Sequence, residues 1–196
     1  MVWQALVKTE NKVLRRIKRL IIVKKKITFI SCFAVAIAIT GAALWREGNT
    51  DKGLLTGALM LFQLAGVHSD LKLKIIPVWL MPASLLLGAV IIHTTAGAEG
   101  FKNHIIGAVM AFFVLALMIF ISKGQIGGGD LQLFVTTGFF TGSYAIVGVI
   151  LLSTVLSGLY SLLLLFFKKV GRDTEFAFAP FALYATAFVS LGSTEF

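Results

Sequence analysis

Two aspartates, Asp70 and Asp130, are the residues of this sequence that could do chemistry together. Only 9 of the 196 residues are acidic, and each of these two lies where a long apolar run meets a polar turn. A close pair of carboxyl groups can hydrolyse a peptide bond, because one takes a proton from water while the other, protonated, polarises the scissile carbonyl. Such a pair titrates as a unit. Asp70 and Asp130 are therefore candidate catalytic residues of an aspartyl protease.

Three glycines immediately before Asp130 strengthen this interpretation. Gly127, Gly128 and Gly129 have no side chains, so a substrate strand or a neighbouring helix can approach their backbone closely. The alternatives are structural. The glycines could form a flexible loop, and Asp130 is well placed to favour a helix N-terminus.

The composition indicates the environment in which these residues work. The chain is 58% hydrophobic and only 14% charged, whereas a soluble domain carries about 25% charge. Its mean hydropathy is +0.92. These values argue against a soluble enzyme, a disordered chain or a nucleic-acid-binding domain, and they predict that most of the chain lies in a bilayer. The single cysteine, Cys32, excludes a disulfide framework and a four-cysteine zinc site within the chain.

The apolar runs predict an all-α fold, a polytopic transmembrane helix bundle of six to seven spans. We expect spans at about 27–45, 53–68, 75–93, 104–122, 131–141, 145–167 and 176–191. The run 131–167 is too long for one span, and Gly142-Ser143-Tyr144 is the expected break. The fifth span is then short, so either it enters the bilayer partway or the break lies elsewhere. Gly138 and Gly142 form a GxxxG pattern that predicts close helix packing.

The positive charges predict the orientation of the chain. The net charge is +9, and most basic residues lie between apolar runs. Residues 1–26 form a basic amphipathic segment suited to an anionic cytoplasmic leaflet, or else a charge cluster that acts only in topology. Residues 27–196 form a single transmembrane domain. The positive-inside rule places the N-terminus and both aspartates on the cytoplasmic side.

Three patches of the sequence resemble the type IV prepilin peptidases, the GxGD intramembrane aspartyl proteases. The patches are Ser69-Asp70-Leu71-Lys72-Leu73-Lys74-Ile75-Ile76-Pro77, Gly127-Gly128-Gly129-Asp130-Leu131-Gln132-Leu133 and Phe178-Ala179-Pro180-Phe181. Their order and spacing agree with the family, and the resemblance covers about residues 53–192.

The resemblance implies a membrane-embedded endopeptidase of the prokaryotic cytoplasmic membrane. Such an enzyme cleaves short leaders from prepilin-like proteins of type IV pili or protein secretion at the cytoplasmic face, without a cofactor or metal. Asp70 and Asp130 would be catalytic. The active-site loop would comprise Gly127, Gly128, Gly129, Pro77, Gln132 and Pro180.

Two residues depart from the family pattern. Gln132 stands where the family usually has Lys, which removes a positive charge close to Asp130, and Val78 stands where Asn usually follows Ile-Pro. The chain also lacks the cysteine-rich insertion of the bifunctional members, so it resembles the shorter, peptidase-only branch.

Two other functions compete with proteolysis. Intramembrane aspartates often mark ion paths, so a small ion-coupled transporter or channel component is one alternative. An inactive family relative acting in pilus or secretion assembly is the other. His68, His93 and His104 do not form an HExxH motif, so a metalloprotease is unsupported. The substrate and the oligomeric state stay open.

Overall fold

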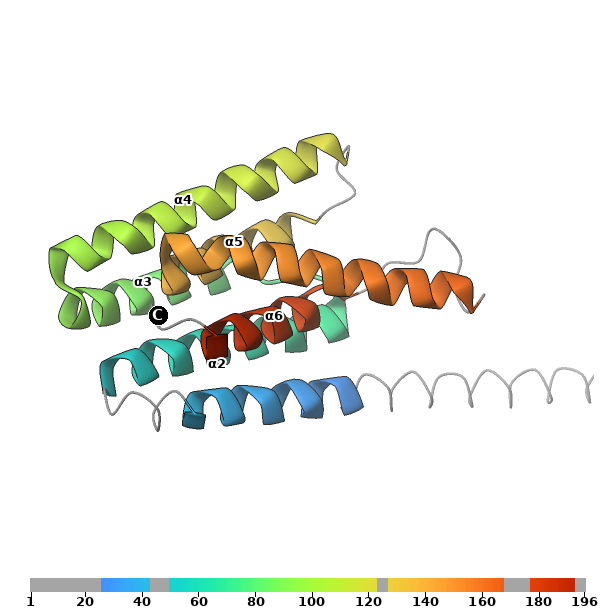
Figure 1. Cartoon of the computed structure of the whole chain (residues 1–196), viewed down its shortest axis with the longest axis horizontal. Coiled ribbons are helices and arrows are strands. Elements are labelled where there is room, and N and C mark those ends of the chain that lie inside the picture. Colours follow the sequence, from blue (N-terminus) through green and yellow to red (C-terminus); the bar gives the residue numbers. More distant parts are fainter. Residues whose placement is uncertain (1–25, 43–49, 123–126, 168–176, 193–196) are drawn as a thin grey trace, which may run out of the picture.

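The computed structural model describes residues 26–42, 50–122, 127–167 and 177–192. In this part of the chain all regular structure is helical, which confirms the predicted all-α class. A helix at Lys26–Ala42 is followed by α2 (Thr50–Leu73), α3 (Leu80–Thr95), α4 (Gly97–Ile121), α5 (Gly128–Phe166) and α6 (Ala179–Gly192). The helices lie roughly along one direction, and α5 packs against α2, α3, α4 and α6 (Figure 1).

Several helix boundaries differ from the predicted spans. Helix α2 continues through Asp70 to Leu73, so the aspartate lies within the last helical turn. Helix α3 begins only at Leu80, because Pro77 has no N–H and disfavours helical geometry at the preceding residue. Helix α4 begins at Gly97, several residues before the predicted span, since helices extend beyond the apolar stretch that crosses the lipid.

The predicted break near Gly142 is confirmed. Gly142 has φ 78° and ψ −179° inside α5, a backbone conformation that is essentially restricted to glycine. In Figure 1 the first limb of α5 (128–141) runs to the left, and the second limb (143–166) returns to the right. The described residues therefore contain seven apolar helical segments, and the first limb of α5, at 128–141, is among the shorter ones.

Glycines bring α4 and α5 into backbone contact at this reversal. A Cβ at Gly107 would overlap the Gly138 carbonyl oxygen, and a Cβ at Gly138 would overlap the Gly107 carbonyl oxygen. The Gly107 position also abuts Gly142, whose carbonyl carbon would lie 2.6 Å from an added Cβ. The GxxxG pattern thus serves close packing, as predicted.

Polar side chains of α4 bind the backbone where α5 reverses. The Ser143 N–H donates to Asn103 Oδ1 over 3.3 Å, and the Ser143 hydroxyl bonds the same oxygen. His104 Nδ1 lies 2.9 Å from the Phe139 carbonyl oxygen. These bonds satisfy backbone and hydroxyl groups that would find no partner in lipid.

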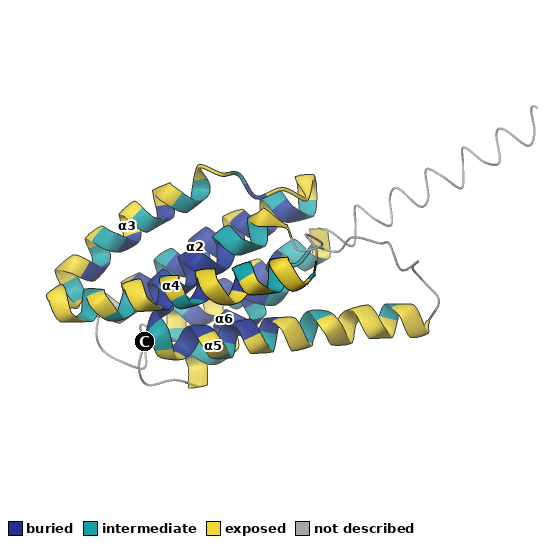
Figure 2. Ribbon diagram, turned by 90° about the horizontal axis from the view of Figure 1, so that it is seen from above, coloured by how far each residue is buried: buried dark blue, intermediate teal, exposed yellow. Residues whose placement is uncertain are grey.

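Burial divides the bundle into a core and an apolar outer surface. Figure 2 shows buried residues concentrated in α2, the first part of α5 and α6, whereas the far end of α5 is mostly exposed. Large exposed side chains such as Phe113, Phe120 and Phe166 are apolar, as a lipid-facing surface requires. Three described helices are long and apolar enough to cross a membrane: Gly53–Leu73, Gly97–Ile121 and Gly128–Phe166.

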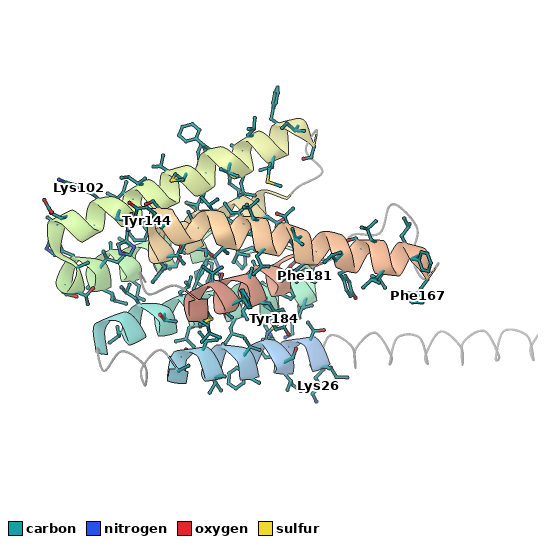
Figure 3. The ribbon with its side chains drawn as sticks, viewed as in Figure 1. Lys26, Lys102, Tyr144, Phe167, Phe181 and Tyr184 are labelled. Carbon is teal, nitrogen blue, oxygen red and sulfur yellow. The ribbon has the colours of Figure 1, made fainter. Side chains whose placement is uncertain are left out.

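The N-terminal helix is tied to α6 by a polar contact. The Ser31 hydroxyl and the Tyr184 hydroxyl are 2.6 Å apart. Figure 3 shows Lys26 and Phe167 toward one end of the bundle, and Lys102 and Tyr144 toward the other. These four residues mark the two ends of the bundle.

Candidate active site

Asp70 is a buried carboxylate at the junction of two helices. It lies in the last turn of α2, and only 9% of its surface is exposed. Its Oδ2 accepts a 3.0 Å hydrogen bond from the backbone N–H of Ala179, the first residue of α6. The positive end of the α6 dipole therefore faces Asp70, which favours a negative charge there.

The Phe178-Ala179-Pro180-Phe181 patch explains why α6 begins beside Asp70. Pro180 is the second residue of the helix, a position at which its missing N–H breaks no helical hydrogen bond. The Phe178 ring packs against Phe134 of α5 with the centroids 5.7 Å apart. Pro180 is buried and, lacking an N–H, donates no hydrogen bond to either carboxylate, so its contribution is to start α6 at this point.

Asp130 lies in the first turn of α5, preceded by the three glycines. Gly127 is extended, with φ −71° and ψ 144°, and its carbonyl accepts the Asp130 N–H at 3.0 Å. The Gly127 backbone lies close enough to the Asp130 carboxylate to favour its charged form. A carboxylate in the first turn of a helix is favoured by the positive end of the helix dipole, so this position is compatible with the structural alternative considered for Asp130.

The two aspartates interact. Asp70 lies within electrostatic range of the Asp130 carboxyl group, and Asp130 is itself half-buried. The pair forms because α2 ends, and α5 and α6 begin, at the same end of the bundle (Figure 1). Two partly desolvated like charges favour a state in which the pair holds one proton.

The glycine run packs against the segment that follows α2. An added Cβ at Gly129 would lie 3.2 Å from Ile76 Cβ, and Ile76 is itself buried. Gly128 is exposed, with no atom within 4 Å of an added Cβ. Pro77 is half-buried in the same segment as Ile76. Gly129 is therefore a member of the run at which an added side chain would press on its neighbour.

The two departures from the family pattern differ in their surroundings. Val78 is 72% exposed. Gln132 is half-buried, and its Oε1 is a buried acceptor with no hydrogen-bond partner.

Two contributors to the site escaped the sequence analysis. The Ala179 N–H holds Asp70, and Ile76 supports Gly129. Pro180 was the available signal for the first, because proline marks the start of a helix. The basic segment predicted at 1–26 lies outside the described residues, apart from Lys26 at its end.

Comparison with known proteins agrees with this arrangement. The profile of the type IV leader peptidase family matches residues 57–162, more than half of the chain. The chain belongs to this family. The match includes both Asp70 and Asp130, which lie on two different helices of the candidate site.

The chain is also similar to a curated leader peptidase. The prepilin leader peptidase/N-methyltransferase of Bacillus subtilis (strain 168) is 23% identical over 141 residues, which cover 61% of this chain. The alignment spans 57% of the length of that relative. No solved structure matches the chain. Membership of the leader peptidase family and the long apolar helices together make the chain an integral membrane protein, and they support peptidase activity.

Proposed function

We propose that this protein is an aspartyl endopeptidase that cleaves short leader peptides from prepilin-like membrane proteins. The observation that carries the proposal is that two carboxyl groups meet at one end of the bundle: Asp70 is buried in the last turn of α2, and Asp130 is half-buried in the first turn of α5, within electrostatic range of Asp70. Asp70 is held in place by the backbone N–H of Ala179, and Asp130 lies beside the Gly127 backbone at the start of α5.

The pair hydrolyses the leader as an acid–base unit. The ionised member takes a proton from water, whose oxygen attacks the scissile carbonyl carbon, while the protonated member donates to the carbonyl oxygen. The C–N bond then breaks, and a proton passes to the leaving amine. The products are a leader with a free carboxylate and a mature chain with a free amino terminus.

The cytoplasmic leaflet is the side on which we place the site. Lys72 and Lys74 are exposed beside Asp70, and Lys26 lies toward the same end in Figure 3. Lys102 lies at the opposite end. This excess of basic residues is typical of the cytoplasmic side. We also propose that residues 1–26 bind the anionic lipids of that leaflet.

Replacing each aspartate with asparagine tests the mechanism. Asparagine is nearly isosteric with aspartate and keeps an oxygen that accepts the same backbone bond, so Asp70→Asn and Asp130→Asn should insert and fold. Each should abolish cleavage of a co-expressed prepilin-like substrate, because the acid and the base cannot replace each other.

The control is Asp173→Asn, which removes an acidic residue outside the three sequence patches and should cleave normally. Substantial cleavage by both site variants, or none by the unaltered chain, would overturn the proposal. An ion-flux assay on the unaltered chain would then test the transporter alternative.

A further inference from the structure

A fully buried polar cluster joins the three helices that form the candidate site. Gln63 of α2 donates from Nε2 to Thr137 Oγ1 of α5 at 3.0 Å and to Thr186 Oγ1 of α6 at 2.7 Å. All three side chains are 0% exposed. The mechanism above uses none of them.

The cluster involves the same three helices as the candidate site, about two helical turns further into the bundle. Gln63 precedes Asp70 by seven residues on α2, Thr137 follows Asp130 by seven on α5, and Thr186 follows Ala179 by seven on α6. Seven residues are close to two helical turns, so each pair shares a helix face, about 10 Å apart along the axis. Each helix thus carries one member of the site and one of the deeper cluster.

The hydrogen bonds of the cluster have only one consistent direction. The Thr137 hydroxyl donates its proton to the Leu133 carbonyl at 2.8 Å, and the Thr186 hydroxyl donates to the Ala182 carbonyl at 2.9 Å. Both hydroxyls therefore accept from Gln63, whose amide nitrogen has two protons to give. Each bond fixes the rotation of one helix against α2.

A contribution to stability does not by itself explain why a glutamine is buried at position 63. Its Oε1 is buried and has no partner, and an unsatisfied buried acceptor costs free energy that an apolar side chain would not. Polar groups buried at such a cost can specify register instead. Between the cluster and the site, Gly66 of α2 meets Leu133 of α5 closely, at 3.2 Å for an added Cβ, so a shift at one level is passed to the other.

We infer that Gln63 is a positioning residue: through Thr137 and Thr186 it sets the register of α5 and α6 against α2, and so holds Asp130 and Ala179 in place around Asp70. The inference rests on the proposed function for its kinetic consequences, but its geometric claim can be tested separately.

Two buried threonines one turn apart on α5 provide a matched kinetic test. Thr137 and Thr141 both donate to the carbonyl four residues earlier, but only Thr137 accepts from Gln63. Thr137→Val should lower kcat for substrate cleavage about tenfold while KM stays within about twofold, because small misplacements of catalytic groups slow turnover steeply. Thr141→Val should have a kcat and a KM close to those of the unaltered chain.

A conservative variant separates the hydroxyl from the shape of the side chain. Thr137→Ser keeps the hydroxyl and should restore kcat, and Gln63→Met, which loses both interhelical bonds, should be at least as slow as Thr137→Val. Equal rates for Thr137→Val and Thr141→Val, or a serine variant as slow as the valine one, would overturn the inference.

A spin-label distance tests the register without any cleavage. Labels at Lys72→Cys and Gly128→Cys, in a Cys32→Ala background, report the separation of the site ends of α2 and α5. Thr137→Val should broaden or shift this distance distribution, and Thr141→Val should not. If the unaltered chain cleaves nothing, the proposed function fails while this measurement still decides the inference; an unchanged distribution for Thr137→Val would refute it.

Discussion

Gly129→Ala should impair cleavage because there is no room for a methyl group between α5 and the segment after α2. The added Cβ would lie 3.2 Å from Ile76 Cβ, 3.4 Å from Ile76 Cγ1 and 3.5 Å from the Ile76 backbone nitrogen. The Cβ of Ile76 is fixed by its backbone, so no change of rotamer can move it, and that backbone is restricted by Pro77, which follows. Ile76 is also only 5% exposed. Carbon atoms prefer separations of about 3.5–4.0 Å, and the two segments must therefore part by roughly 0.5 Å.

The displacement falls on the residue next to Asp130. A misplacement of about 1 Å can cost about a hundredfold in rate, so on a logarithmic scale about 0.5 Å corresponds to about tenfold. We expect Gly129→Ala to insert, to keep its thermal unfolding temperature in detergent within a few degrees, and to cleave a prepilin-like substrate about tenfold more slowly.

Gly128→Ala is the matched control for this prediction. Gly128 and Gly129 both lie in the first turn of α5, so alanine changes helix propensity at both in the same sense. An added Cβ at Gly128 meets nothing within 4 Å. Initial rates for both variants should be measured in the same detergent with the same substrate. Equal, near-normal rates would refute the reasoning and reduce the glycine run to a linker.

Three further predictions concern the reversal, the topology and the unpartnered glutamine. Gly142→Ala should destabilise the protein by at least about 1 kcal/mol, measured as a lower unfolding temperature, because φ is 78° and the new Cβ would lie 2.7 Å from Asn103 Nδ2; Gly148→Ala, with its nearest contact at 3.6 Å, should be neutral. Gln132→Met should raise KM for the substrate more than it lowers kcat, if the buried oxygen receives a substrate donor; an unaltered KM would contradict that role. Reporter fusions should all read cytoplasmic at three positions: Lys72, Lys123 and Arg172.

Sequence reasoning located the features that depend on residue type. Proline and glycine have local consequences that do not need the rest of the fold, so the break at Gly142 and the close packing of Gly138 could be predicted. Charge placement along the chain indicated that Asp70 and Asp130 lie at one end of the bundle. These predictions required only periodicity, hydropathy and the special backbone properties of glycine.

Interhelical contacts could not be predicted in the same way. Asp70 is held by the backbone N–H of Ala179, a group that every residue except proline carries, so no residue type points to it. In the sequence, Gln63 is one polar residue in an apolar run. Its proposed role depends on two threonines that are far away in the sequence. The start of α4 was missed for a simpler reason: hydropathy follows the apolar stretch, whereas the helix also includes the more polar residues 97–103.

The short first limb of α5 has a consequence for the supply of water to the site. Residues 128–141 rise about 21 Å, whereas the hydrocarbon of a bilayer is about 30 Å thick, so one end of the limb must stay within lipid. Asn103 makes the Gly142 end the suitable one, because it accepts from the Ser143 N–H that lipid would leave unsatisfied. The end of the limb that carries Asp130 can then remain at the membrane interface, where both water and a membrane-anchored substrate are present. An amide side chain buried within the bilayer, at the opposite end of the limb, thus keeps Asp130 within reach of solvent.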